Sequence, residues 1–256
     1  MRVAIVTGAA QGIGRRTAEV LGEAGYKLLL LDVQPCGATV SALRAADSEA
    51  EVLIGDITDE ALIAQAVSSV MQRWGRADVL VNNAGISFIA PAETIEAPAF
   101  RRVLEVNLVA PFVLSRAFGA IMLAQREGSI VNVASIAGLV GVSDRAAYNA
   151  SKHGLIGLTR TLAGEWGGRG VRVNAVCPGW VKTEMDVADQ AGGGYTDEDI
   201  TGRVPMARFA RPDDIARAIL FLADPAQSGF VNGQTLAVDG GWTADGSWQS
   251  LRMRKR

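Results

Sequence analysis

Seven short apolar runs, spread along the whole chain, constrain the fold most strongly. Each run is rich in Val, Ile and Leu and is apolar at successive positions, as expected of strands that are covered on both faces. The runs lie at residues 3–7, 27–33, 50–55, 78–84, 128–135, 171–177 and 234–240. Helical patterns fill the gaps between them, at residues 13–24, 59–74, 98–125, 146–166 and 212–223. This alternation predicts an α/β fold with a doubly wound parallel sheet of seven strands and helices on both faces.

Length and composition narrow the class of protein. A chain of 256 residues suits one large α/β domain, so we expect a single domain over residues 1–256. The 25 basic and 27 acidic residues nearly balance, which argues against a nucleic-acid or anionic-membrane partner. No apolar run approaches the ~20 residues of a membrane span, and the N-terminus does not resemble a signal peptide, so we expect a cytoplasmic protein. Two isolated cysteines and one histidine predict no metal site.

Two segments depart from the alternation. Residues 184–211 are polar and contain several glycines, and a long loop at such a place often forms a lid over a substrate. The tail, residues 241–256, ends with four basic residues among its last five. The simplest interpretation of the tail is a solvated basic extension. The alternative is that Trp242, Trp248 and Arg252 pack on a neighbouring subunit.

A glycine-rich turn, TGAAQGIG, follows the first predicted strand and opens the first predicted helix. Its spacing, G-x-x-x-G-x-G, differs from the common G-x-G-x-x-G pattern, but the physical basis is the same. Glycines allow the backbone to approach a pyrophosphate, and the N-terminus of the helix stabilises the anion. The turn therefore predicts a Rossmann-type dinucleotide site. The expected contacts are Gly8, Gln11, Gly12, Ile13 and Gly14.

Asp32 ends the second predicted strand, 18 residues after the last glycine of the turn. A carboxylate there accepts hydrogen bonds from the ribose hydroxyls of an adenosine and repels a 2′-phosphate. Its neighbour Val33 carries no charge, and position 11 is not basic. Arg15 and Arg16 are expected to point along the helix. The sequence therefore favours NAD(H) over NADP(H).

The stretch YNASK places Tyr148 and Lys152 four residues apart, on one face of a predicted helix. A free phenol has a pKa of ~10, and a nearby ammonium lowers it, which makes tyrosine a usable acid and base. Ser135 ends the fifth predicted strand, at the sheet edge where ligands bind, and its hydroxyl would stabilise charge on a substrate oxygen. An ordinary surface pair of tyrosine and lysine is the alternative, and the convergence with Ser135 and the glycine turn argues against it.

These motifs, in this order, resemble the short-chain dehydrogenase/reductase family, in its branch of single-domain chains. The resemblance covers nearly the whole chain. The matching motifs are TGxxxGIG, an Asp-Ile pair at 56–57, NNAG at 82–85, the Asn of EVNLVAP, a Ser after the fifth strand, YxxxK, PGxxxT at 178–183 and VDGG near the end.

The resemblance implies roles for residues that spacing alone does not explain. Lys152 would also bind the hydroxyls of the nicotinamide ribose, and Asn107 would hold a water that links Lys152 to solvent. The catalytic set is then Asn107, Ser135, Tyr148 and Lys152. The further cofactor contacts that the resemblance implies are Asp56 and Ile57 at the adenine, Asn83, Ala84 and Gly85 at the adenosine ribose, and Pro178, Val181 and Thr183 at the nicotinamide.

The resemblance also implies an activity. The chain would be an NAD(H)-dependent oxidoreductase that transfers a hydride between the nicotinamide and a secondary alcohol, such as a sugar, a polyol or a cyclic alcohol. Two alternatives stay open: a 3-oxoacyl-(acyl-carrier-protein) reductase, which usually takes NADPH, and a non-catalytic NAD(H)-binding sensor. Relatives are commonly homotetramers, so we expect a homotetramer that binds a small-molecule substrate.

Overall fold

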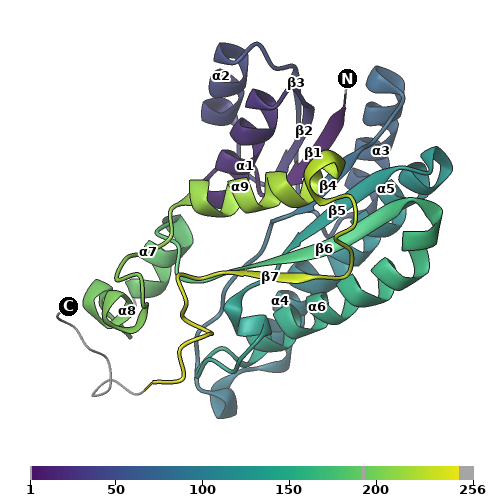
Figure 1. Cartoon of the computed structure of the whole chain (residues 1–256). Helices are drawn as coiled ribbons and strands as arrows, with labels where there is room; N and C mark the ends of the chain where they lie inside the picture. The colour runs from purple at the N-terminus through teal and green to yellow at the C-terminus, as the bar shows by residue number, and fades with distance from the viewer. Residues whose placement is uncertain (1, 192–193, 248–256) are drawn as a thin grey trace.

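The structure is a computed structural model, which describes residues 2–191 and 194–247 (Figure 1). A parallel sheet of seven strands lies at its centre, in the order β3-β2-β1-β4-β5-β6-β7. The predicted doubly wound α/β fold is therefore confirmed, and each predicted strand is present with bounds that differ by at most two residues. The strands are β1 (Val3–Thr7), β2 (Lys27–Asp32), β3 (Ala50–Ile54), β4 (Val79–Asn82), β5 (Gly128–Val133), β6 (Val171–Pro178) and β7 (Thr235–Val238).

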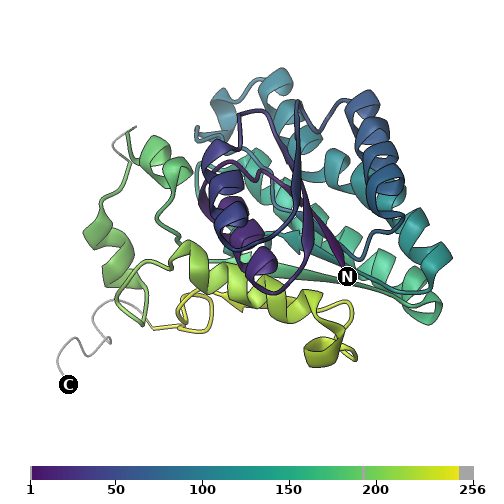
Figure 2. The ribbon, with the colours of Figure 1, turned by 90° about the horizontal axis from the view of Figure 1, so that it is seen from above.

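Helices cover both faces of the sheet (Figures 1 and 2). On one face lie α1 (Gly12–Glu23), α9 (Pro212–Ala223) and α2 (Gly37–Ala45), a helix that the sequence analysis did not predict. On the other face lie α3 (Glu60–Trp74), α5 (Ala110–Gln125) and α6 (Ala146–Trp166). The remaining helices are α4 (Ala97–Leu104), α7 (Glu184–Gln190), α8 (Asp197–Arg203) and α10 (Pro225–Ser228).

The two faces form separate cores, which explains the uninterrupted apolar runs. Along β1, Val3 and Ile5 pack in the core beneath α3, α5 and α6. Ala4 and Val6 pack in the core beneath α1 and α9. Successive side chains of a strand point to opposite faces. A strand that is buried on both faces is therefore apolar at every position and shows no alternation of apolar and polar residues.

The long helical stretch predicted at 98–125 is interrupted by a π-helical turn, Glu105–Val109. Such turns insert an extra residue into a helix and occur frequently at functional sites. The turn carries Asn107, which is fully buried. The candidate catalytic asparagine therefore occupies the one irregular turn of this stretch.

By length and mean hydropathy (1.7), the continuous stretch Ala97–Gln125 could also cross a membrane, which the sequence analysis did not anticipate. Half of its most apolar window is buried inside the protein. Leu114, Phe118 and Met122 belong to the core against the sheet, so packing within the fold accounts for the apolar composition.

The segment after β6 extends beyond the carboxyl edge of the sheet (Figure 1). Where the sequence predicted an irregular stretch over 184–211, the structure has the two short helices α7 and α8. Thr183 caps α7 by accepting a hydrogen bond from the Asp186 backbone, and Thr196 forms a reciprocal capping box with Asp199 at α8. Each helix is too short to show an apolar period, which is why the sequence pattern missed them.

Candidate active site

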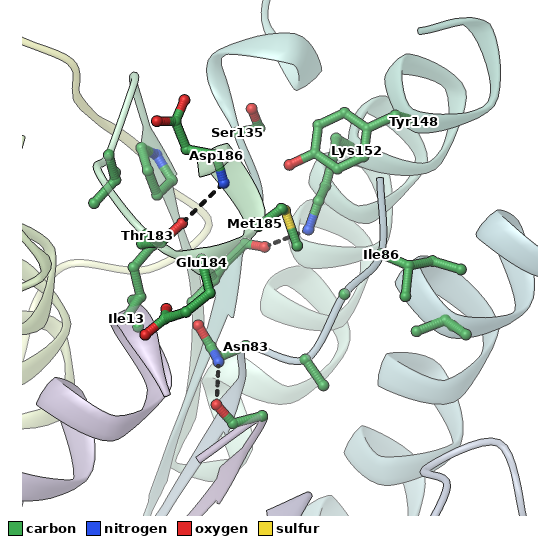
Figure 3. Close-up of a pocket in the computed structure, with 18 of the residues that line it drawn as sticks. Ile13, Asn83, Ile86, Ser135, Tyr148, Lys152, Thr183, Glu184, Met185 and Asp186 are labelled. Carbon is green, nitrogen blue, oxygen red and sulfur yellow. Dashed lines mark hydrogen bonds between the residues drawn. The ribbon is translucent and has the colours of Figure 1, made fainter. Parts of the chain in front are cut away.

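A cavity of about 470 Å³ lies at the carboxyl edge of the sheet and extends from the glycine turn to α7 and Tyr195 (Figure 3). Seventeen of the predicted site residues line it: Gly8, Gln11, Gly12, Ile13, Asp32, Val33, Asp56, Ile57, Asn83, Ala84, Gly85, Ser135, Tyr148, Lys152, Pro178, Val181 and Thr183. The other two, Gly14 and Asn107, are buried residues outside this lining.

The glycine turn is shaped as a cradle for an anion. Gly8 and Gly12 have φ of +66° and +55°, which favour glycine. A Cβ on Gly14 would overlap the carbonyl oxygen of Gly8, and a Cβ on Gly8 would lie 2.7 Å from Nδ2 of Asn83. The Glu184 carboxylate borders the turn, with Oε2 only 3.3 Å from where a Cβ of Gly12 would be. The bare turn at the start of α1 thus fits the pyrophosphate of a dinucleotide.

The NNAG motif fixes this turn to the sheet. Nδ2 of Asn83 donates to the carbonyl oxygens of Thr7 and Gly8, at 2.9 and 3.1 Å. In return, Oγ1 of Thr7 accepts from the backbone N–H groups of Asn83 and Ala84, each at 3.0 Å. Asn82 donates to the side chain of Asn132 on β5 at 2.8 Å, which joins two central strands. The motif therefore braces both the turn and the sheet.

Asp32 is held by backbone groups rather than by cations. Its Oδ2 accepts from the Ala10 N–H at 2.8 Å, and its Oδ1 accepts from the Gln34 N–H at 2.9 Å. The residue is only 9% exposed and lines the cavity. The two hydrogen bonds fix the Asp32 carboxylate at the wall of the cavity.

The two arginines of α1 face away from this carboxylate. Nε of Arg15 donates to Glu19 at 2.8 Å, one helical turn further along. Arg16 binds Glu19 at 3.0 Å and reaches Asp213 of α9 at 2.8 Å. The expectation that both arginines follow the helix is confirmed.

Asp56 has a partner that the sequence did not reveal. Arg102 of α4 binds its carboxylate at 2.5 Å, and Thr58 donates to it through its backbone and its hydroxyl, each at 2.9 Å. Burial raises the pKa of Asp56, but the hydrogen bonds from Thr58 and Arg102 lower it overall. The neighbouring Ile57 is 5% exposed and packs in the core as well as lining the cavity.

Tyr148, Lys152 and Ser135 converge on one part of the cavity. Tyr148 and Lys152 project from α6 into the same space, as predicted from their spacing (Figure 3). Nζ of Lys152 donates to the carbonyl oxygen of Val133 at 2.8 Å and lies 5.6 Å from the centre of the phenol ring. Ser135 follows β5 and accepts the backbone N–H of Ala137 at 3.1 Å. The geometry presents a phenol, a hydroxyl and an ammonium to one ligand.

The pKa values of this group differ from the prediction. Burial raises the pKa of Tyr148 and outweighs the hydrogen bond with Ser135, which lowers it. The expected lowering by Lys152 is not among the effects on this pKa, and the ammonium donates to the Val133 carbonyl. Burial lowers the pKa of Lys152 itself to about 8. Of Tyr148 and Lys152, Lys152 therefore has the pKa closer to neutral pH.

Asn107 lies behind Gly85. Its Nδ2 donates to the Ile86 carbonyl at 2.9 Å and to the Ser151 hydroxyl at 3.2 Å, and its Oδ1 accepts the Ile86 N–H at 2.9 Å. A Cβ on Gly85 would lie 3.2 Å from this Oδ1 and 3.7 Å from Nζ of Lys152. Asn107 and Lys152 therefore border the same small space beside Gly85, where a Cβ would be tightly packed.

Sequence reasoning missed the wall of the cavity opposite the glycine turn. Arg145 pairs with Asp189 of α7 at 2.8 Å, and the guanidinium lies over the Trp180 ring at 5.6 Å. Tyr195 packs edge-on to Trp180 at 5.0 Å and donates to Asp186 at 3.1 Å. The one signal in the sequence was the place of these residues along the chain. Arg145 precedes Tyr148 by three residues, and the other residues of this wall lie in or beside the predicted lid.

The tail begins by packing on its own chain. The guanidinium of Arg203, at the end of α8, lies 4.9 Å from the centre of the Trp242 ring. Trp242 thus has an intramolecular partner. Trp248 and Arg252, the other residues proposed to reach a neighbouring subunit, lie outside the described residues.

Comparison with known proteins identifies the family. The family model described as enoyl-(acyl carrier protein) reductase matches residues 8–243. A cis-4-hydroxycyclohexanecarboxylate dehydrogenase from Sinomonas cyclohexanicum is 42% identical, over 95% of this chain and 97% of the relative. The chain belongs to the short-chain dehydrogenase/reductase family. It is therefore an oxidoreductase, and the resemblance inferred from its motifs is confirmed.

Other members of the family show how varied its substrates are. A 3-oxoacyl-(acyl-carrier-protein) reductase from Thermotoga maritima is 36% identical, over 94% of this chain and 97% of the relative. A crystal structure assigned as an NAD(P)-dependent gluconate 5-dehydrogenase from Beutenbergia cavernae, with NADP bound at low occupancy, is 43% identical with a TM-score of 0.88. It covers 95% of this chain and 97% of its own. A nicotinamide dinucleotide is thus the cofactor class of the family fold.

Proposed function

We propose that this chain is an NAD(H)-dependent oxidoreductase that transfers a hydride between a secondary alcohol and the nicotinamide, with Tyr148 as its acid and base. The observation that carries the proposal is the convergence of Tyr148, Ser135 and Lys152 on a cavity that also contains the glycine cradle. The alcohol or ketone end of a substrate and a dinucleotide fit the two halves of this one cavity.

NAD(H) is the preferred cofactor in this proposal because of Asp32. Its buried carboxylate repels a 2′-phosphate, and Arg15 and Arg16 are paired elsewhere. The bound NADP of the gluconate dehydrogenase structure belongs to that protein, so the preference needs a direct test. The proposed cofactor contacts are the cofactor-binding residues that the sequence predicted and that line the cavity. Gly14 belongs with them, because its lack of a Cβ leaves room for the carbonyl of Gly8 in the turn.

The chain's own residues would handle the proton. When bound, the nicotinamide supplies the hydride acceptor. Tyr148, deprotonated to the phenolate, would take the proton of the alcohol at its oxygen and become the phenol, and Ser135 would hold the substrate oxygen and stabilise its charge. Lys152, whose pKa is about 8, would bind the nicotinamide ribose and receive or return the proton near neutral pH. Asn107, behind Gly85, would hold the water that leads from Lys152 to solvent.

The same proposal extends to the whole molecule. One dinucleotide-binding and catalytic domain would comprise residues 1–256, and residues 184–211 would form the substrate lid. We propose a cytoplasmic homotetramer whose partners, apart from its own copies, are small molecules. The balance of basic and acidic residues supports the small-molecule partners, since the chain has no excess of basic residues to bind a nucleic acid or an anionic membrane.

The substrate class we favour is a sugar, a polyol or a cyclic alcohol, or an acid derived from one of them. The names of two relatives support this, since one oxidises a hydroxycyclohexanecarboxylate and the other is assigned to gluconate. The second candidate function is reduction of a 3-oxoacyl-(acyl-carrier-protein). The Thermotoga maritima reductase supports it, but that activity would favour a cofactor that Asp32 disfavours.

Turnover tests the proposal directly. The purified protein is assayed at 340 nm with NAD⁺ and with NADP⁺, over a panel of polyols, cyclic alcohols, hydroxy acids and 3-hydroxyacyl thioesters. Oxidation of an alcohol with NAD⁺ is the expected result. Preference for NADP⁺ and a thioester would support the acyl reductase instead. Binding of NADH without turnover of any substrate would contradict catalysis and support a sensor.

A further inference from the structure

We propose that Arg145 binds a carboxylate of the substrate, at the end of the substrate away from its carbinol. In the protein without substrate, the carboxylate of Asp189 occupies this binding position on Arg145. The preferred substrates would then be hydroxy acids rather than neutral alcohols. This inference rests on the proposed oxidoreductase function and names the substrate class for the same site.

Arg145 is a buried cation placed beside the acid/base residue. It occupies the N-cap position of α6, three residues before Tyr148, and is 8% exposed. Its Nη1 donates to the Ser87 hydroxyl at 2.9 Å and to Asp189 at 2.8 Å. Within residues 2–191 and 194–247, no hydrogen bond of its Nη2 or Nε is found, although the residue lines the cavity. The guanidinium therefore has donors to spare for a ligand.

A buried guanidinium needs an anion, because an unpaired buried charge is strongly unfavourable. Asp189 supplies that anion from α7, on the predicted lid, whereas Arg145 belongs to the framework beneath it. A substrate carboxylate has the same charge and shape as the Asp189 carboxylate and matches the planar fork of arginine. It could replace Asp189 on Arg145 without leaving the cation unpaired.

The other charges of this wall are engaged. Asp186 lies 3.2 Å from Nζ of Lys182 and accepts from Tyr195. Glu184 borders the glycine turn, in the nucleotide half of the cavity. The ammonium of Lys152 is directed to the Val133 carbonyl. Arg145 is thus the cation of the described cavity wall that faces the substrate half.

The pair also lies close enough to the reacting group to act on it. Burial has the largest effect on the pKa of Tyr148 and raises it, whereas Arg145 lowers this pKa and Asp189 raises it. Arg145 and Tyr148 are three residues apart at the start of α6 and both line the cavity, so a substrate held by Arg145 would lie beside the phenol. The competing explanation is that the pair only latches the lid to the framework.

Binding of ligands that cannot react separates these explanations. With NADH present, titration calorimetry compares cyclohexanecarboxylate with the neutral cyclohexanecarboxamide, in the wild type, Asp189→Asn, Arg145→Gln and the double variant. The wild type should bind the acid about 10-fold more tightly than the amide, as charge-assisted hydrogen bonds predict. Asp189→Asn should bind the acid about 10-fold more tightly than the wild type does, because the Asp189 carboxylate no longer competes for Arg145. Its affinity for the amide should change less than about twofold.

Arg145→Gln and the double variant should both lose the preference for the acid. The double variant removes both charges, so it keeps the result readable if the single variant fails to fold. Arg116→Gln, which removes a cation from the exposed pair with Glu60, is the matched control and should bind as the wild type does.

Two results would overturn the inference: the wild type binding the acid no more tightly than the amide, or Asp189→Asn changing the affinity for acid and amide by the same factor. Either result would support the explanation that the pair only latches the lid to the framework. Turnover of neutral alcohols would then still support the oxidoreductase. The two ligands lack a carbinol, so their binding does not depend on turnover. A preference for the acid would therefore support the role of Arg145 even if no substrate were turned over, and failure of the inference can be told apart from failure of the proposed function.

Discussion

The two halves of the cavity are built in different ways. In the nucleotide half, most contacts involve a backbone group, with the pair of Asp56 and Arg102 as an exception: the Gly8 N–H donates to the Leu31 carbonyl at 2.8 Å, and backbone N–H groups hold the Asp32 carboxylate. In the substrate half, side chains distant in sequence make them. Arg145 meets Asp189, 44 residues later, and Ser87 meets the same carboxylate from 102 residues away.

The difference explains how one framework serves many substrates. A site made of backbone turns and strand ends is fixed by the fold and tolerates few side chains. A site made of side-chain pairs on short capped helices can change its partners without disturbing the sheet. We therefore expect mutations in the nucleotide half to affect folding and cofactor binding, and mutations in the substrate half to affect substrate choice.

Gly14→Ala should have the largest effect. Its Cβ would overlap the Gly8 carbonyl, so we expect a loss of about 3 kcal/mol or more in the free energy of unfolding and loss of NADH binding. Chemical denaturation and NADH fluorescence measure both. Gly157→Ala, on α6 with nothing within 4 Å of the new Cβ, is the control and should keep binding. Unchanged NADH binding by Gly14→Ala would contradict the cradle.

Lys152 should make stability depend on pH. Its pKa falls from 10.5 in the unfolded chain to about 8 in the folded protein. Between these values the unfolded chain holds a proton that the folded protein has released, so the folded state gains stability as pH rises. The wild type, compared with Lys152→Met, should gain about 3 kcal/mol from pH 8 to 10.5.

Denaturation of the protein without cofactor, at a series of pH values, measures this gain. Lys182→Met is the control, because the hydrogen bond that Lys182 donates to Asp197 raises the pKa of Lys182, and its loss should give no such rise. A constant difference between the wild type and Lys152→Met across the window would contradict the buried ammonium.

Asp32→Ser should relax the choice of cofactor. Removing the carboxylate removes the repulsion of a 2′-phosphate, so the ratio of kcat/KM for NAD⁺ over NADP⁺ should fall about 10-fold. Adding Val33→Arg, at a residue that is 63% exposed, should lower the ratio about 100-fold. Val33→Arg alone, with Asp32 kept, is the comparison. An unchanged ratio in the double variant would mean that Asp32 does not select the cofactor.

Thr196→Ala should have the smallest effect and should be confined to the substrate half. It removes the capping box of α8, worth about 1 kcal/mol to that helix. Fraying of the lid should raise the KM for substrate by up to about fivefold and leave the dissociation constant of NADH unchanged. A matching change in NADH binding would mean that the two halves are not separate.

The sequence predicted the nucleotide half well because its signals are local. Glycines with positive φ, an acid at a strand end and two residues on one helix face all follow from short spacings. The prediction missed Arg102 beside Asp56 and Asp189 beside Arg145, because these pairs form only when distant segments meet. It also missed the π-turn that carries Asn107, since the stretch is so apolar that a one-residue shift of its pattern does not show.

The predicted lowering of the Tyr148 pKa failed for a related reason. Spacing placed the ammonium of Lys152 on the correct face, but the distance to the Val133 carbonyl and the burial of both residues are properties of the packed molecule. At Tyr148, burial therefore has the largest effect on the pKa.

The most direct test of the account is Tyr148→Phe, which removes a single oxygen from the site. With a substrate turned over by the wild type, the rate at 340 nm should fall at least about 100-fold, while the dissociation constant of NADH stays within about twofold. Tyr26→Phe, a buried tyrosine outside the cavity, should keep the rate. Turnover by Tyr148→Phe at the rate of the wild type would contradict the assignment of Tyr148 as the acid and base.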